Sequence, residues 1–173
     1  MWFWRFVCLG FIAYATLFLE AEEPAFNKEI LAYVKTNLEM RGTLCQNAEG
    51  FVYVKVDDEY IHKLVQFLAG QGFEEPPYFG RAELVGAHIS VIYTQELQQK
   101  PLENIVELGQ SIVFEPIECK VVQPPTWPEV EAVYLIAITA PELAKIRQKY
   151  GLPESKYAFH ITIGIKRAAA KAA

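Results

Sequence analysis

The sequence predicts an α+β domain built from two strand–helix–strand units. Residues 51–56 alternate in the manner of a strand, and residues 133–138 form a second, continuously apolar strand. Each segment is followed by a helical apolar stripe that ends at a glycine, Gly70 or Gly151, and then by a second apolar strand. Aligning Val52 with Val133 gives an offset of 81, which also superimposes the two glycines. Two such units can pair about an approximate two-fold axis, with equivalent residues facing each other across a cleft.

The first half begins with a helical pattern at residues 27–39, which Gly42 ends. After the strand at 51–56, Asp57 or Asp58 can cap a helix that runs to about Ala69. A loop rich in proline and glycine, residues 74–86, leads into the next strand. We therefore expect one lobe at about residues 45–93.

The second lobe is expected at about residues 130–167, inside a single domain that spans residues 26–173. Thr139 can cap its helix, with Pro141 in the first turn. Within the connecting segment, residues 94–129, the sequence predicts a helix at 96–109 despite Pro101. It also predicts one or two strands at 111–122, broken at Pro116.

The composition is that of a globular protein, with 52% hydrophobic and 13% aromatic residues. Acidic residues outnumber basic ones, and the net charge is −5. This charge disfavours binding to a long nucleic-acid duplex, which requires many phosphates to be neutralised. A small nucleotide or one phosphate-bearing terminus remains compatible, and we expect a monomer.

The N-terminus has the features of an export signal at residues 1–21: Arg5 precedes an apolar stretch at 6–19. The prediction is a secreted or periplasmic protein without a stable membrane partner; an uncleaved membrane anchor is the main alternative. Export would allow Cys45 and Cys119 to pair, although two separate buried thiols fit equally well.

The strongest chemical signal is a motif that occurs twice. His88 precedes Ser90 by two residues, and His160 precedes Thr162 in the same way, each within an apolar strand. Because side chains at i and i+2 share one face of a strand, each histidine projects together with its hydroxyl. Both copies end a strand–helix–strand unit, which predicts that the two pairs line one groove.

Two histidines in one site can hold opposite protonation states near neutral pH. One imidazole can then accept a proton from water while the other donates a proton to a leaving oxygen. The hydroxyls of Ser90 and Thr162 can hold the non-bridging oxygens of a phosphodiester. Neither motif carries a third metal ligand, so we expect neither a metal nor another cofactor.

The doubled motif and the stretch from Lys156 to Gly164 resemble the two-histidine (2H) phosphoesterase superfamily, and most closely its Swiss Army Knife RNA repair-like branch. The resemblance implies a bilobal fold with mainly antiparallel sheets around a central cleft. It implies metal-independent hydrolysis of 2′,3′-cyclic phosphates, at RNA ends or in cyclic nucleotides, or of related 2′-5′ linkages. It gives His160 the role of base and His88 that of acid, although a near-symmetric site permits the reverse.

Further candidates are aromatic or basic residues near the motif strands. Tyr78, Tyr93 and Tyr157 can stack on a base, and Arg81 can meet a phosphate. Two alternatives to an enzyme remain open. The same four motif residues can hold a nucleoside monophosphate without turnover, or the repeat can be architectural in a secreted structural domain.

Overall fold

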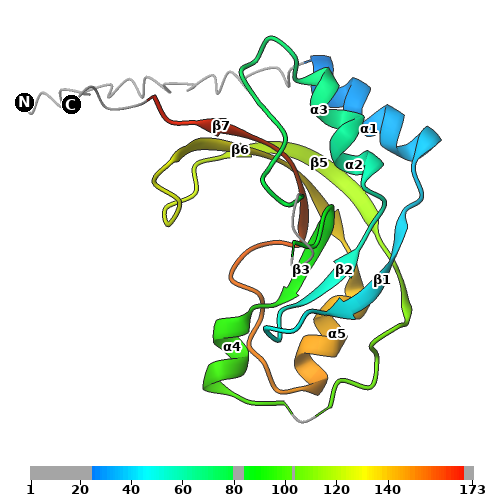
Figure 1. Cartoon of the computed structure of the whole chain (residues 1–173). Coiled ribbons are helices and arrows are strands. Elements are labelled where there is room, and N and C mark those ends of the chain that lie inside the picture. The colour runs from blue at the N-terminus through cyan, green and yellow to red at the C-terminus, as the bar shows by residue number, and fades with distance from the viewer. Residues whose placement is uncertain (1–24, 80–83, 103, 170–173) are drawn as a thin grey trace, which may run out of the picture.

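The computed structural model describes residues 25–79, 84–102 and 104–169. Its centre is a curled, antiparallel, seven-stranded sheet with the strand order β4-β1-β2-β3-β7-β6-β5 (Figure 1). The elements, in chain order, are α1 Ala25–Asn37, β1 Arg41–Gln46, β2 Val52–Lys55, α2 Glu59–His62, α3 Leu64–Phe67, β3 His88–Ile92, α4 Thr94–Gln99, β4 Ser111–Val113, β5 Glu115–Val122, β6 Val130–Thr139, α5 Pro141–Lys149 and β7 His160–Arg167. The α+β class and the mainly antiparallel sheet are therefore confirmed.

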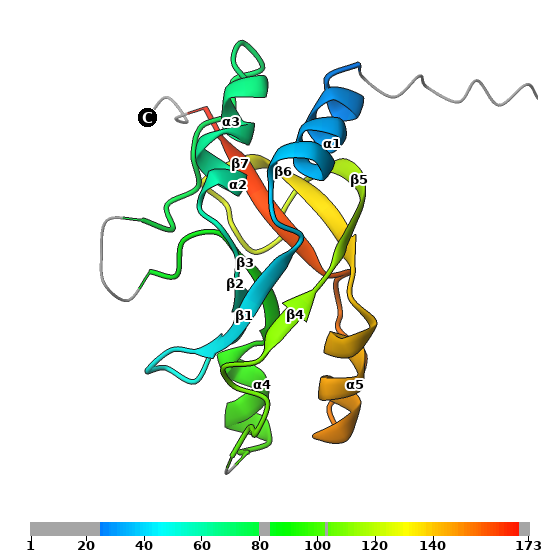
Figure 2. The same cartoon turned by 90° about the vertical axis from the view of Figure 1, so that its right-hand side faces the viewer.

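The sheet has two halves that meet at β3 and β7. Strands β4, β1, β2 and β3 form one half, and β7, β6 and β5 form the other. Helices α1, α2 and α3 gather at one end of the molecule, while α4 and α5 lie at the other (Figure 2). Strands β4 and β5 both come from the segment that the sequence assigned to a connection, so this segment supplies one outer strand to each half.

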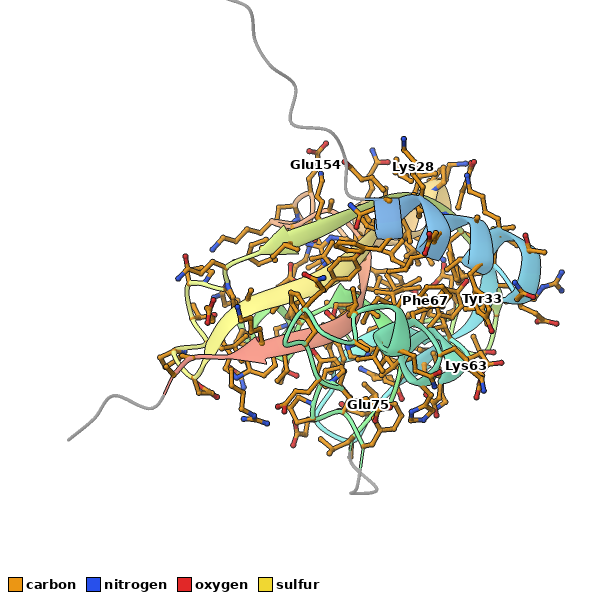
Figure 3. The ribbon with its side chains drawn as sticks, turned by 90° about the horizontal axis from the view of Figure 1, so that it is seen from above. Lys28, Tyr33, Lys63, Phe67, Glu75 and Glu154 are labelled. Carbon is orange, nitrogen blue, oxygen red and sulfur yellow. The ribbon has the colours of Figure 1, made fainter. Side chains whose placement is uncertain are left out.

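Helix α1 covers part of the sheet face that carries the main hydrophobic core. Ile30 and Val34, one helical turn apart, are fully buried on the face of α1 that packs toward the sheet. Tyr33 meets Phe67 of α3 with 5.3 Å between ring centroids, as the labels in Figure 3 let the reader follow. The predicted helix at 27–39 is thus confirmed, with its ends shifted by two residues.

The helix predicted from Asp57 or Asp58 to Ala69 is divided at Lys63 into α2 and α3. The Asp57 carboxylate accepts a hydrogen bond from the Glu59 N–H at 2.9 Å. The Asp58 carboxylate instead accepts one from the Ala87 N–H at 2.9 Å. Asp58 therefore ties the start of α2 to the residue before His88.

Three predicted boundaries in the rest of the chain were wrong. The helix expected at 96–109 ends at Gln99, because Pro101 lacks an N–H and restricts the residue before it. The break expected at Pro116 lies at Phe114, and Pro116 sits within β5 beside a bulge. Thr139 is the last residue of β6; Ala140 occupies the N-cap of α5, with Pro141 following it.

Cys45 lies on β1 and Cys119 on β5, and no disulfide joins them. The expected export signal at residues 1–21 falls outside the described residues. In the described part of the chain, no helix has the length and hydrophobicity of a bilayer-crossing segment.

Candidate active site

The junction between β3 and β7 assembles the doubled motif. Ile89 is paired with Ile161 across these antiparallel strands. The antiparallel register then sets His88 beside Thr162 and Ser90 beside His160, on the opposite face from the two isoleucines. Each histidine therefore neighbours the hydroxyl of the other motif, and the four side chains form one cluster with approximate two-fold symmetry.

A bulge follows each motif hydroxyl. On β3, the bulge lies between Ser90, which opposes Tyr53, and Ile92, which opposes Val52. On β7, the equivalent bulge lies between Thr162 and Gly164, which oppose two successive residues of β6. Because a bulge inserts one residue and increases the local twist, both strands bend at the point where the motifs end. The duplication seen in the sequence therefore extends to the irregularities of the two strands.

A single cavity of about 620 Å³ receives both motifs. His88, Ser90, His160 and Thr162 all line it. The floor is provided by the same face of β6, where Ala137 lies opposite His160 and Leu135 lies opposite Thr162. The predicted meeting of the two pairs in one groove is thus what the fold produces.

Both imidazoles are held in the same way. Nδ1 of His88 donates to the Gly86 carbonyl at 2.8 Å, and Nδ1 of His160 donates to the Ala158 carbonyl at 2.8 Å. A carbonyl oxygen can only accept, so Nδ1 carries a proton in each ring. In the neutral form of either ring, Nε2 is then the atom with the free lone pair. Each ring is therefore prepared to exchange a proton at Nε2.

The comparisons with known proteins agree with this geometry. Residues 52–170, more than half of the chain, match the model of the Swiss Army Knife 2H phosphoesterase domain. The chain belongs to this family of 2H phosphoesterases. Neither the curated proteins nor the solved structures gave a match. The match includes both motif strands, β3 and β7.

The two histidines of this 2H phosphoesterase have different surroundings. The His88 ring makes edge contacts with Phe51, Tyr53 and Tyr78, with centroid separations of 5.6, 6.0 and 5.0 Å. Among the described residues, His160 makes no such ring contact. On β2, Tyr53 lies beside Ser90 and Lys55 lies beside His88. At the equivalent places on β6, the apolar residues Leu135 and Ala137 lie beside Thr162 and His160.

This asymmetry has an electrostatic consequence. Burial lowers the pKa of the His88 imidazole; the hydrogen bond to Gly86 opposes this shift, and the charges of His160 and Lys55 add to it. A histidine with a lowered pKa is mostly neutral at pH 7. His88 is therefore suited to accept a proton.

Each motif hydroxyl of the 2H phosphoesterase also interacts with a tyrosine in the cavity wall. Burial raises the pKa of Tyr78, and a hydrogen bond with Thr162 counteracts this shift. Burial likewise raises the pKa of Tyr93, and a hydrogen bond with Ser90 counteracts it. The two phenols are thus protonated at neutral pH and can orient the hydroxyls.

Arg147 of α5 holds the two halves of the site together. Only 2% of this residue is exposed. It forms a bidentate pair with Glu96 of α4, with N–O distances of 2.6 and 3.1 Å. It also donates to the carbonyls of Val91, at the end of β3, and Pro153, in the segment before β7. One buried cation thereby fixes the chain beside both motifs.

The other predicted contacts have mixed outcomes. Tyr93 and Tyr157 line the cavity. Arg81 lies outside the described residues. The sequence did not indicate Tyr53, Arg147 or Trp127 as site residues. Arg147 stands beside other polar residues in α5, so no local pattern distinguishes it. Within the described ranges, no three histidine, cysteine or acidic side chains gather as a metal site would need.

Proposed function

We propose that this 2H phosphoesterase hydrolyses 2′,3′-cyclic phosphates, at an RNA end or in a cyclic nucleotide, or related 2′-5′ linkages. The observation that carries the proposal is that two imidazoles with protonated Nδ1 atoms line the same cavity as Ser90 and Thr162. Phosphodiester hydrolysis needs a base for water, an acid for the leaving oxygen and donors for the phosphoryl oxygens. These four side chains can supply all three.

In the proposed reaction, His88 is the base and His160 is the acid. This reverses the assignment taken from the family resemblance, because the aromatic surroundings of His88 favour its neutral form. Nε2 of His88 takes a proton from water as the water oxygen bonds to phosphorus. The bond from phosphorus to the ribose oxygen breaks, and that oxygen receives the Nε2 proton of the His160 imidazolium. The product is a phosphomonoester with a free ribose hydroxyl.

Ser90 and Thr162 are proposed to hydrogen-bond the non-bridging oxygens throughout this step. We propose that their hydrogen bonds with Tyr93 and Tyr78 orient these hydroxyls in the cavity. For the base of the reacting nucleotide we propose stacking on Tyr157, which is 42% exposed at the cavity wall. The chain would act as a monomer without a metal or cofactor.

The test is a screen of the purified full chain against 2′,3′-cyclic mononucleotides, oligonucleotides with 2′,3′-cyclic ends and 2′-5′ dinucleotides, in EDTA. We expect hydrolysis of at least one class, with the product identified by phosphorus NMR. Loss of activity in EDTA and recovery with zinc would contradict the metal-free mechanism. Binding of nucleoside monophosphates in calorimetry without turnover of any substrate would favour a binding module instead.

A further inference from the structure

The cavity continues well beyond the four motif side chains. Thr162 of β7 is paired with Leu135 of β6, which is in turn paired with Lys120 of β5. Neighbouring strands are about 4.8 Å apart, so the backbones of Lys120 and Thr162 are roughly 10 Å apart. Lys120 also lines the cavity. The cavity floor therefore extends from the two motifs to the Lys120 side chain on the outer strand β5.

Trp127 forms a wall of this outer part. It lies in the β5–β6 connection, which bends toward the concave side of the sheet (Figure 1). Trp127 packs against Val130, Val133 and Ile165, which form a small cluster separate from the main core. Ile165 lies opposite Val133 of the cavity floor, just beyond the bulge that follows Thr162. An indole held in this way offers a fixed stacking surface at the rim.

The charge of the lining also favours an anion. The described lining residues include Lys120 and Lys156 but no carboxylate, in a chain whose net charge is −5. Lys120 pairs with Glu118 at 2.7 Å, and both side chains are about half exposed. An exposed pair of this kind contributes little to stability, so it can give way to a phosphate.

We propose that Trp127 and Lys120 form a subsite for a second nucleotide. Trp127 stacks the base on the 5′ side of the reacting nucleotide, and Lys120 binds the phosphate that joins the two nucleotides. The inference rests on the proposed function and narrows its substrate class to the end of an RNA chain. A free cyclic mononucleotide would leave this subsite empty.

The test uses two product-like ligands with the same terminus, tri-uridine 3′-phosphate and uridine 3′-monophosphate. Binding is measured by calorimetry and by tryptophan fluorescence of the full chain. Trp127 is one of three tryptophans, and the other two, Trp2 and Trp4, stand at the N-terminus. The difference between wild type and Trp127→Phe therefore isolates the signal of Trp127.

We expect the trinucleotide to quench Trp127 and to bind about tenfold more tightly than the monophosphate. Lys120→Gln should weaken the trinucleotide at least fivefold more than the monophosphate. It should also reduce the slope of log affinity against log salt by roughly 0.7. The control is Lys63→Gln: Lys63, labelled in Figure 3, is equally exposed and paired with Glu59, and its loss should change neither ligand.

The outcomes separate this inference from the proposed function. Quenching by the trinucleotide supports the subsite, even if no cyclic substrate is hydrolysed. Equal affinity for both ligands, without quenching, overturns the subsite and leaves any observed hydrolysis as evidence for the proposed function. Absence of binding and of hydrolysis overturns both.

Discussion

Ile89 and Ile161 face each other across β3 and β7 and join the two halves of the sheet. Each isoleucine stands between the histidine and the hydroxyl of its own motif. Both are fully buried, so this contact fixes the register of the two motif strands from the core side. If one strand slipped by one residue relative to the other, one motif would face the core while the other still faced the cavity.

The first prediction concerns the two hydroxyls. Ser90→Ala and Thr162→Val each remove a donor to a phosphoryl oxygen while nearly preserving volume. We expect kcat/KM to fall by about 10²- to 10³-fold for each variant, with an unchanged pH profile. Steady-state kinetics on the best substrate of the screen measures this. Thr139→Val, at the exposed end of β6, is the control and should behave as wild type. Normal rates in both motif variants would remove the hydroxyls from the mechanism.

The second prediction concerns pH. Because the pKa of His88 is lowered from 6.5, the base form persists to more acid pH, and the rising limb of kcat/KM should lie below pH 6.5. Tyr53→Ala opens the wall around His88, which reduces desolvation and should move this limb toward higher pH. A pH profile of each protein provides the measurement. Tyr33→Ala, which removes a ring contact far from the site, should leave the limb in place. A limb that shifts to lower pH in Tyr53→Ala would contradict the assignment of His88 as base.

The third prediction concerns the Arg147 clamp, by which we mean the hydrogen bonds of Arg147 with Glu96, Val91 and Pro153. Arg147→Met removes the donor that the Glu96 carboxylate shares with two backbone carbonyls, and leaves Glu96 with the bond from the Tyr93 N–H alone. The free energy of unfolding should therefore fall by about 3–5 kcal/mol. Denaturant titration measures the loss. Lys166→Met removes a half-exposed ion pair with Glu131 and should cost less than about 1 kcal/mol. Equal losses of unfolding free energy in the two variants would mean that the clamp stabilises the fold no more than an exposed ion pair does.

The clamp also predicts a pH dependence of stability. The Arg147 guanidinium holds the pKa of the Glu96 carboxyl below its usual value of 4.5. Stabilisation by this group is therefore complete above about pH 4.5 and is lost as the pH falls through the lower folded pKa. Glu96→Gln should flatten this part of the stability curve. A curve identical to that of wild type between pH 5 and 3 would count against the pairing in solution.

The site was easier to predict than the boundaries of the elements. The His-x-hydroxyl strands have a period of two and sit in apolar runs, so both the faces and the pairing of motifs follow from the sequence. The repeat alignment was nevertheless wrong by one residue on the first strands. Tyr53 corresponds in space to Leu135, whereas the sequence paired it with Tyr134. The bulges that set this register leave no mark in the local sequence.

Other features depend on contacts that no local pattern encodes. The β1 segment, Arg41–Gln46, has one fully buried side chain, Leu44, and was not recognised as a strand. Trp127 lies among prolines that indicate a connection, yet the connection folds into the cavity wall. Arg147 differs from a solvent-facing arginine only through Glu96 and two carbonyls supplied by other segments.

The central claim is that His88 and His160 act as one acid–base pair. Its most direct test is the initial rate of 2′,3′-cyclic phosphate hydrolysis in EDTA by His88→Ala, His160→Ala and the double variant. His62→Ala, which removes the remaining histidine of the chain, is the control. We predict losses of about 10²- to 10⁴-fold in each single variant, a double variant little worse than either, and a fully active His62→Ala. Full activity in either single variant, with the fold intact by circular dichroism, would contradict the account.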